Sequence, residues 1–390
     1  MKDKKNFIIG LIIGAMLISL IQGIFSFTKK HQKQFLIDKE QSIKENGFCF
    51  CKDIQNEITI ENTDKISLRN LDDGQSFVDI SAIYNIDEQE KLLKELYEKT
   101  KFIQNESNDD FNIWTTSDTH GDIVMLMEGL LKSGLIKWDG KTKIGTYNAY
   151  KDKNFKVVYP DVKINNKFKG KYINLGDIVN KKAFGMMSLF LLHDIFEKTK
   201  NKDGTNDKVK IIIGNHEYAD MNMKNFKEYS PYKNTLKKFI DMFIVYYEEN
   251  GISFTHAPMS EDMKPENDEI IKQLNSSILD DKDYKIQHML WGAGATTFGY
   301  IKSVFKTQSP DKIAPCNVSG HTHGFINFGY NKRADVLNIS TDRFNKDETK
   351  RGIIFRINTK DKKIYSYTKT KSKDKIIENV LQKNLFFCNK

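Results

Sequence analysis

Short apolar runs that stop abruptly at polar or glycine residues constrain the fold of this chain most. Each run holds β-branched or aromatic residues and is followed within a residue or two by Gly, Asp or His, a pattern typical of buried strands. Where strands of an α/β sheet are parallel, the residues after their carboxyl ends gather at one edge. The sequence therefore predicts a mixed α/β domain with one polar site, built on strands at residues 111–117, 171–175, 209–213, 252–255 and 317–319.

Helices and a terminal hairpin are expected around these strands. Residues 122–134 and 184–198 carry apolar side chains at helical spacing and should pack on the sheet. Residues 87–100 form a similar pattern behind an acidic first turn. The segments GIIFRI and KIYSY flank the turn NTKDKK, which predicts a hairpin that closes the C-terminal edge.

The N-terminus carries a long apolar segment. Residues 7–27 are apolar apart from two serines and one glutamine, and lysines lie on both sides. This length predicts an uncleaved, single-pass transmembrane helix that attaches the chain to a membrane. A cleaved signal peptide, and hence a secreted protein, is the alternative, although no small-residue cleavage motif closes the segment. Because lysines flank both ends, the side of the membrane that holds the rest of the chain stays open.

Four regions follow from these patterns. Residues 1–30 are the anchor or signal segment, and residues 31–110 form a stalk or accessory region. Residues 111–358 form the catalytic domain, and residues 359–390 hold the rest of the terminal hairpin and a tail. The 61 basic and 52 acidic residues give a formal charge of +9, which suits anionic phosphates or membrane surfaces. No nucleic-acid-binding signature is present, so no nucleic-acid partner is expected.

Residues with nitrogen and oxygen donors cluster in the predicted site. Five of the eight histidines follow predicted strands, within the motifs DTHGD, GNHE and GHTHG and after ISFT. A lone Gly-Asp pair is often a turn and a lone histidine often a core residue, but their shared context favours a site for divalent metal ions. The candidate ligands are Asp118, His120, Asp177, Asn215, His256, His321 and His323, and His216 lies beside them.

The order of these motifs resembles the calcineurin-like metallophosphoesterases, whose pattern runs D-x-H, G-D, G-N-H-E, H and G-H-x-H. The resemblance covers residues 111–345 and is strongest to bacterial members of the serine/threonine-phosphatase-like branch. It implies two facing mixed β-sheets flanked by helices, in four layers. It also implies that one metal is held by Asp118 and His120, that Asp177 bridges, and that Asn215, His256 and His321 hold the second. In the wider superfamily His323 would join the first metal.

The resemblance also implies a mechanism. Two cations about 3.5–4 Å apart would activate a bridging water for in-line attack on phosphorus, and His216 would protonate the leaving group as general acid. Manganese is the first candidate, and iron, zinc or nickel would suit the same donors.

The chain departs from the branch pattern after its G-D motif. Asn180 and Lys181 stand where that branch usually has aspartate and arginine. Asparagine cannot stabilise a charged imidazole as a carboxylate does, so Glu217 is another candidate partner for His216. Lys181 keeps a positive charge for phosphate but lacks the guanidinium fork. We expect Lys182 to share this phosphate-binding task.

Three functions are compatible with these residues. The first is hydrolysis of phosphate monoesters on phosphoproteins or small molecules, including protein serine/threonine dephosphorylation. The second is hydrolysis of dinucleoside polyphosphates or other phosphodiesters. The third is a membrane-tethered binding protein whose site has decayed, and the complete set of metal ligands argues against it.

Overall fold

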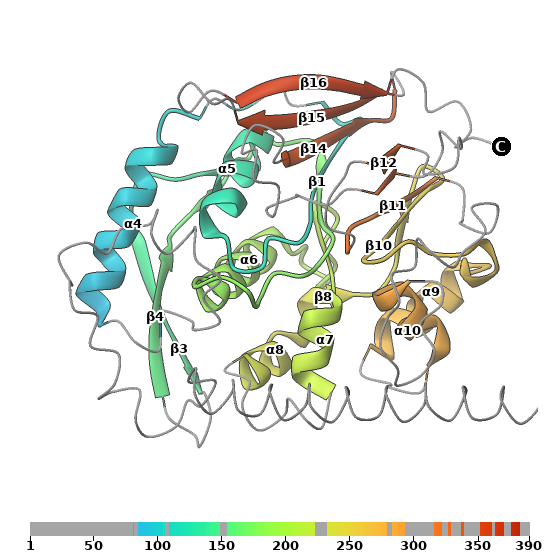
Figure 1. Ribbon diagram of the computed structural model, residues 1–390, viewed down its shortest axis with the longest axis horizontal. Helices are drawn as coiled ribbons and strands as arrows, with labels where there is room; N and C mark the ends of the chain where they lie inside the picture. Colours follow the sequence, from blue (N-terminus) through green and yellow to red (C-terminus); the bar gives the residue numbers. More distant parts are fainter. Residues whose placement is uncertain are drawn as a thin grey trace, which may run out of the picture. The chain divides into compact units, whose positions relative to one another are not determined.

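The larger sheet contains the first three of the predicted strands. This computed structural model describes residues 81, 85–103, 105, 109–148, 154–222, 232–278, 283–292, 316–321, 327–328, 337–338, 352–360, 363–369 and 376–382. Seven strands form the sheet in the order β16-β15-β14-β1-β6-β7-β8 (Figure 1). The strands β1, β6, β7 and β8 are parallel, and β14, β15 and β16 add an antiparallel edge. Their bounds are β1 Asn112–Thr116, β6 Lys171–Asn174, β7 Val209–Ile212, β8 Phe243–Ile244, β14 Gly352–Asn358, β15 Lys363–Lys369 and β16 Ile376–Gln382.

The smaller sheet contains the other two predicted strands. Five strands form it in the order β12-β13-β11-β10-β9, with β10, β11 and β13 parallel. The bounds are β9 Tyr247–Glu249, β10 Ile252–Thr255, β11 Asn317–Ser319, β12 Asn327–Phe328 and β13 Leu337–Asn338. All five predicted strands are thus confirmed, and they are divided between two sheets.

An apolar layer joins the two sheets. Residues alternate along each strand of the larger sheet, so that Ile113 faces one side and Trp114 the other. The side of Ile113 packs against the smaller sheet, which confirms that the sheets face each other. The residues buried in this layer are Ile113, Ile173, Leu175, Ile212, Ile252, Phe254, Val318, Phe355, Ile357 and Ile364.

Helices cover the outer face of the larger sheet, on the side of Trp114. The predicted helices are confirmed as α5 (Ile123–Ser133) and α6 (Gly185–Thr199). The side chain of Asp122 caps α5 by accepting a hydrogen bond from the Met125 N–H at 2.9 Å. The remaining helices are α7 Asn215–Asn222, α8 Lys233–Lys238, α9 Asp268–Ser276 and α10 Tyr284–Trp291, with short 3₁₀ turns η4 Ile240–Met242 and η5 Glu261–Met263. The fourth layer, helices outside the smaller sheet, stays a prediction.

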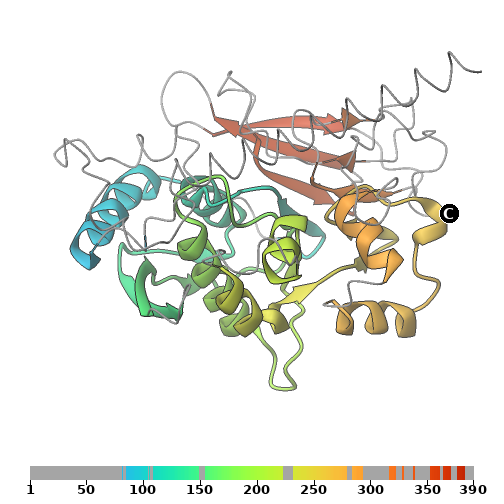
Figure 2. The same cartoon turned by 60° about the horizontal axis from the view of Figure 1, so that its bottom comes forward.

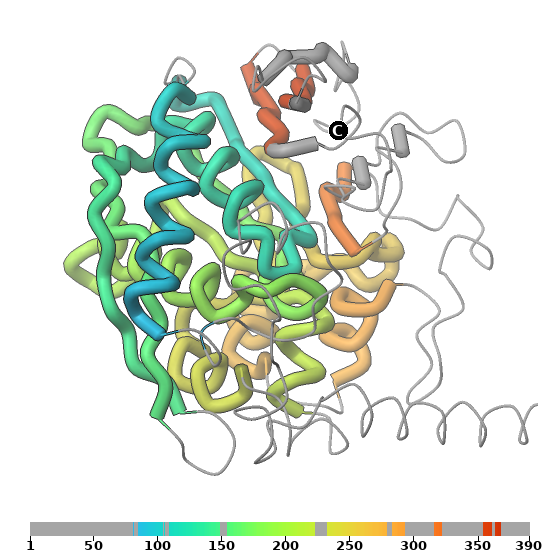
Figure 3. The backbone as a smooth tube through the Cα atoms, turned by 60° about the vertical axis from the view of Figure 1, so that its left-hand side comes forward, coloured from blue at the N-terminus to red at the C-terminus, as the bar shows by residue number. Residues whose placement is uncertain are grey.

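The predicted helix at residues 87–100 is confirmed as α4 (Ile86–Thr100). It lies beside the hairpin of β3 (Thr142–Asn148) and β4 (Asn154–Pro160), as Figure 3 shows. Leu92, Leu93 and Leu96 are buried in the same core as α5 and α6. A second small ribbon pairs β2 (Ile136–Lys137) with β5 (Lys163–Ile164). This helix therefore shares the core of the domain, and the boundary at residue 111 stays a prediction.

The C-terminal hairpin is confirmed, and it continues into a third strand. β14 pairs with both β1 and β15, and β16, which the sequence did not predict, follows on the far side (Figure 2). Within the part of the chain described here, no helix combines the length and apolar character needed to cross a bilayer. The predicted anchor at residues 1–30 lies outside the described residues.

Candidate metal centre

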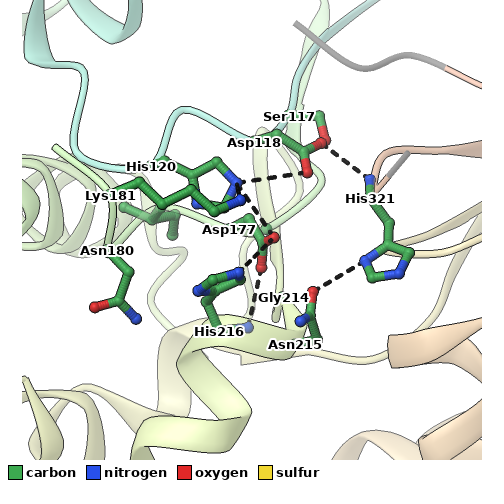
Figure 4. A network of polar contacts seen from close by, with 12 residues as sticks. Ser117, Asp118, His120, Asp177, Asn180, Lys181, Gly214, Asn215, His216 and His321 are labelled. Atoms are coloured by element: carbon green, nitrogen blue, oxygen red, sulfur yellow. Dashed lines mark hydrogen bonds and ion pairs between the residues drawn. The ribbon is translucent and has the colours of Figure 1, made fainter. Parts of the chain in front are cut away.

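The predicted site residues from both sheets meet at the carboxyl ends of their strands. Asp118 and His120 follow β1, Asp177 follows β6, and Asn215 opens α7 after β7. His256 follows β10, and His321 follows β11 in the other sheet. Figure 4 shows Asp118, His120, Asn215 and His321 arranged around Asp177. The structure thus brings together every predicted metal ligand that it describes, and His323 lies outside the described residues.

The backbone of these loops is locally strained. Asp118, His120, Asp177 and His321 have φ angles of 52°, 47°, 54° and 70°. This left-handed region is uncommon for residues other than glycine, and such residues concentrate at functional sites. The conformation turns each side chain off the end of its strand into the shared centre.

The first two site loops are joined through their backbones. The Asp118 N–H donates to the Gly176 carbonyl at 3.0 Å, and the His120 N–H donates to the Asp177 carbonyl at 2.7 Å. Gly176 has a φ of 89°, and a Cβ there would lie 2.4 Å from the Gly214 nitrogen. No other residue fits at this contact without moving the backbone. The close approach of the loops therefore depends on glycine.

Glu217 ties the second and third loops together. Its Oε1 accepts from the N–H groups of Ile178 and Val179 at 2.7 and 2.9 Å, and its Oε2 accepts from those of Asp177 and Gly214 at 2.9 Å each. Burial and the charge of Asp177 raise the pKa of Glu217 to about 7. The sequence suggested Glu217 as a partner for His216, whereas the structure uses it to position the loop of Asp177. Its place in the first turn of a helix was the available signal.

Asp177 lies between two groups of donors. Its Oδ2 is 3.5 Å from His120 Nε2 and 3.9 Å from His216 Nε2, and its Oδ1 is 3.4 Å from His256 Nε2. Burial raises the pKa of Asp177, but His256, His216 and His120 outweigh it and hold the pKa well below its usual value. Asp177 is therefore a carboxylate shared by both groups.

The two histidines nearest Asp177 are fixed by backbone carbonyls. His256 Nδ1 donates to the Leu175 carbonyl at 2.7 Å, and His120 Nδ1 donates to the Val179 carbonyl at 3.2 Å. Because Nδ1 carries the hydrogen, the Nε2 lone pair of each ring faces the centre. This is the arrangement in which a histidine binds a metal, with its other nitrogen held by a second partner.

The side-chain amide of Asn215 faces one ring nitrogen of His256 and one of His321. Its Oδ1 is 2.8 Å from His256 Nε2 and 3.0 Å from His321 Nδ1. Two acceptors at this distance repel each other, and a cation between them would relieve the repulsion. Turning the amide over would relieve it too, since its NH₂ group would then donate to both rings. Asn215 alone therefore does not decide whether this group holds a metal.

Asp118 supplies the deciding observation. Its Oδ2 accepts from Ser117 Oγ and from the His321 N–H at 3.0 Å, and the contact with His321 joins the two sheets. Its Oδ1 is fully buried and has no hydrogen-bond partner among the described residues. A buried carboxylate oxygen without a partner is costly unless a cation neutralises it. Burial and the charge of Asp177 raise the pKa of Asp118 to about 6. The donor set fits divalent cations.

The predicted general acid and the predicted phosphate-binding lysines lie on the more exposed side of the site. The side chain of His216 is 28% exposed, and its ring meets the His120 ring edge-on at 4.8 Å between centroids. Burial, together with the charges of Lys181 and His256, lowers the pKa of His216 to about 4. Lys181 Nζ lies 2.8 Å from His120 Nε2, and Lys182 is partly exposed. Asn180 points away from the centre and donates to Asp220 Oδ2 at 2.9 Å.

Two sets of donor atoms are compact enough to hold a cation. One ligand atom from each of His120, Asp177 and His216 lies within 4.8 Å of the others, and the same holds for Asp177, His256 and His321. The sequence did not predict His216 as a ligand, and its position makes that role the alternative to general acid. The sequence analysis did not single out Ser117 or Asp220, although both lie next to the motif residues.

Comparisons with known proteins gave three results. Comparison with curated proteins found no relative with significant sequence similarity. Solved structures that this chain is similar to include a cold-active protein tyrosine phosphatase, with 12% identity, coverage of 72% of this chain and 81% of the other, and a TM-score of 0.45. Another is the cold-active protein-tyrosine phosphatase of a psychrophile, a Shewanella species, with 12% identity, 72% and 82% coverage and a TM-score of 0.44.

A third solved structure is that of a candidate diadenosine tetraphosphatase, with 11% identity, 71% and 96% coverage and a TM-score of 0.35. The family described as calcineurin-like phosphoesterase matches residues 111–325, which is more than half of the chain and contains the whole site described above. The resemblance to this family is thereby confirmed, and the closeness to its serine/threonine-phosphatase-like branch stays a prediction. The chain belongs to the calcineurin-like phosphoesterase family and is a metal-dependent phosphoesterase.

Proposed function

We propose that this phosphoesterase hydrolyses phosphate monoesters with two divalent cations, manganese being the first candidate. The observation that carries the proposal is the position of the Asp177 carboxylate, with one oxygen 3.5 Å from His120 Nε2 and the other 3.4 Å from His256 Nε2. A carboxylate between two donor groups is what a pair of cations requires. When bound, the cations supply Lewis-acid activation of water and of phosphate oxygens near neutral pH.

The donor groups divide between two cations. Asp118, His120 and Asp177 would hold one cation, and His323 joins them in the prediction from the sequence. Asp177, Asn215, His256 and His321 would hold the other. Carboxylate, amide and imidazole donors without thiolates suit manganese, iron, zinc or nickel.

His216 is proposed as the general acid that protonates the leaving oxygen. Its partly exposed ring lies beside the donor groups, and its N–H donates to Asp177 Oδ1 at 3.1 Å, which fixes the start of α7. A pKa lowered to about 4 leaves the ring neutral at pH 7. A bound phosphate dianion would raise that pKa by favouring the charged ring. Proton transfer of this kind contributes about 10²–10⁴ in rate.

Lys181 and Lys182 are proposed to attract the substrate phosphate. They follow the loop of Asp177 and carry positive charge at the partly exposed side of the site. A phosphoprotein or a small phosphate ester would both present the dianion that such charges recognise. The likeness of SDTHGDIVMLMEGLLKSGLI and IIIGNHEYADM to the serine/threonine-phosphatase-like branch supports a phosphoprotein substrate.

A substrate panel tests the reaction class. We expect Mn²⁺-stimulated turnover of p-nitrophenyl phosphate and of a phosphoserine peptide. Turnover of bis(p-nitrophenyl) phosphate or a dinucleoside tetraphosphate should be at least about tenfold lower. Preferential cleavage of the diester or the tetraphosphate would refute the monoesterase proposal and favour the second predicted function. Absence of turnover with metal bound would favour the decayed site.

His216→Asn tests the role of that side chain. It should retain bound Mn²⁺ and lower turnover about a hundredfold or more. His193→Asn is a matched control, because the His193 side chain is 29% exposed and packs on Phe239, away from the site. Loss of bound Mn²⁺ in His216→Asn would instead make His216 a ligand.

Membrane attachment through residues 7–27 remains part of the proposal and is supported by the sequence alone. Fractionation of cells that express the full chain, or a chain lacking residues 1–30, tests it. We expect only the full chain in the membrane fraction, and recovery of both chains in the soluble fraction would contradict the anchor.

A further inference from the structure

The ammonium group of Lys181 contacts the histidine nitrogen on which the first donor group depends. Lys181 Nζ lies 2.8 Å from His120 Nε2. The opposite ring nitrogen donates to the Val179 carbonyl, so Nε2 carries the lone pair and accepts from the ammonium. The same lone pair is the one that a divalent cation would use. A single lone pair cannot serve both partners.

The carboxylates of this donor group lie near the same histidine nitrogen. His120 Nε2 is 3.5 Å from Asp177 Oδ2 and 4.0 Å from Asp118 Oδ1. Burial lowers the pKa of Lys181, and the charges of Asp177 and Asp118 act in the opposite direction by favouring the ammonium form. The ammonium therefore occupies the nitrogen that a divalent cation would use, next to the carboxylates that such a cation would neutralise.

The backbone of the loop imposes this position. Lys181 and Asn180 have φ angles of 70° and 69°, an uncommon conformation for two consecutive residues other than glycine. The Asn180 side chain donates to Asp220, and the Val179 N–H donates to Glu217. These contacts hold the chain just before Lys181 and aim its side chain back toward His120. Strain that neighbouring contacts maintain in this way is a mark of a functional segment.

The second donor group is built differently. Its ring nitrogens face the Asn215 amide and the Asp177 carboxylate at 2.8–3.4 Å. His256 and His321 also contact each other, at 3.2 Å between ring nitrogens. The amide and the carboxylate can each present an oxygen to a cation there, whereas at His120 the cation would have to displace the ammonium of Lys181.

We propose that Lys181 competes with a divalent cation for His120, so that the two donor groups load unequally. The inference depends on the proposed two-cation function. The group of Asp177, Asn215, His256 and His321 loads first. The group of Asp118, His120 and Asp177 loads only when Lys181 leaves His120, and the long side chain then stays close enough to pair with phosphate. Lys181 would thus couple metal loading to substrate binding.

Metal titration of the full-length chain tests this competition without measuring catalysis. Metal-free protein is titrated with Mn²⁺ in a calorimeter, and bound Mn²⁺ is counted by mass spectrometry after desalting. We expect two classes of site in the wild type. Lys181→Met and Lys181→Gln should tighten the weaker class at least about tenfold and leave the tighter class unchanged, because a like charge next to the ligand has been removed.

Two controls separate charge from shape. Lys181→Arg keeps the positive charge and should leave the weaker class weak. Lys210→Met removes a half-buried lysine that lies over the Tyr247 ring, and its titration should match the wild type. Circular dichroism of each variant checks that it folds.

The outcomes are distinguishable. One bound Mn²⁺ in the wild type and two in Lys181→Met would support the competition in its strongest form. Two classes of site that Lys181→Met and Lys181→Gln leave unchanged would overturn the inference and spare the proposed function. No Mn²⁺ binding in any variant would overturn the two-cation function itself.

Discussion

Replacement of Glu217 with glutamine tests whether one carboxylate holds two site loops in place. Each carboxylate oxygen accepts from two backbone N–H groups, those of Ile178 and Val179 on one side and of Asp177 and Gly214 on the other. Glutamine keeps one acceptor oxygen and turns an NH₂ group toward the other two donors. The loss of two hydrogen bonds to a charged acceptor costs about 3–6 kcal/mol.

Burial of the charge acts in the opposite direction. The pKa of Glu217 is raised from 4.5 to about 7, first by burial and then by Asp177. A shift of this size corresponds to about 3 kcal/mol against the charged form in the folded protein. Because a carboxyl pKa is raised, this cost is fully present above about pH 7 and vanishes below about pH 4.5. At about pH 8, Glu217→Gln should therefore lose up to about 3 kcal/mol of unfolding free energy, the difference between the two effects.

Urea unfolding measures this difference. A chelator keeps metal binding from contributing to the measured stability. Glu266→Gln, at an exposed residue in the loop before α9, is the control and should stay within about 0.5 kcal/mol of the wild type. We also expect weaker Mn²⁺ binding in Glu217→Gln, since the loop of Asp177 is released. A variant with wild-type stability and wild-type Mn²⁺ affinity would refute the positioning role of Glu217.

Three further perturbations follow from the structure. Gly176→Ala places a Cβ at a φ of 89° and 2.4 Å from the Gly214 nitrogen. Urea unfolding should therefore show a loss of more than about 2 kcal/mol in the free energy of unfolding. Wild-type stability would contradict the close approach of the loops. Asp177→Asn removes the shared carboxylate, and mass spectrometry should find less than one Mn²⁺ per chain; two bound ions would exclude its bridging position. Burial lowers the pKa of His288 below 6.5, and its Nε2 accepts from the Ser260 N–H at 3.2 Å. The unfolded chain therefore binds the His288 proton more tightly than the folded chain does. Acidification below about pH 6.5 should destabilise the wild type by up to about 1.4 kcal/mol per pH unit more than it destabilises His288→Asn. Equal pH dependence of unfolding in the two proteins would contradict a buried, neutral His288.

The strands and most of the site could be predicted because their signals are local. Apolar runs such as VKIII and ISFT end at the residue where the observed strand ends or one residue beyond it. The residues that follow these runs include Asp, Asn and His, each placed just after a predicted strand. This is why Asp118, His120 and Asp177 could be named from the sequence. Their convergence follows from the geometry of parallel strands.

Other features depend on contacts that no local pattern reveals. The division of the five strands between two sheets depends on long-range pairing, such as that of β10 with β11. The position of β14 between β1 and β15 is another such pairing. The role of Glu217 depends on backbone amides about 40 residues earlier in the chain, and the pointing of Lys181 at His120 depends on a strained backbone. Sequence reasoning supplied the residue types at these positions but not their partners.

The hydrogen bond from the His321 N–H to Asp118 joins residues 203 positions apart, one after each sheet. Four of the described candidate ligands follow strands of the larger sheet and two follow strands of the smaller, so neither sheet carries the complete set by itself. Chemistry in this protein can begin only once two separately hydrogen-bonded halves have docked. A motion that separates the two sheets by a few ångströms would inactivate the enzyme before the chain unfolds.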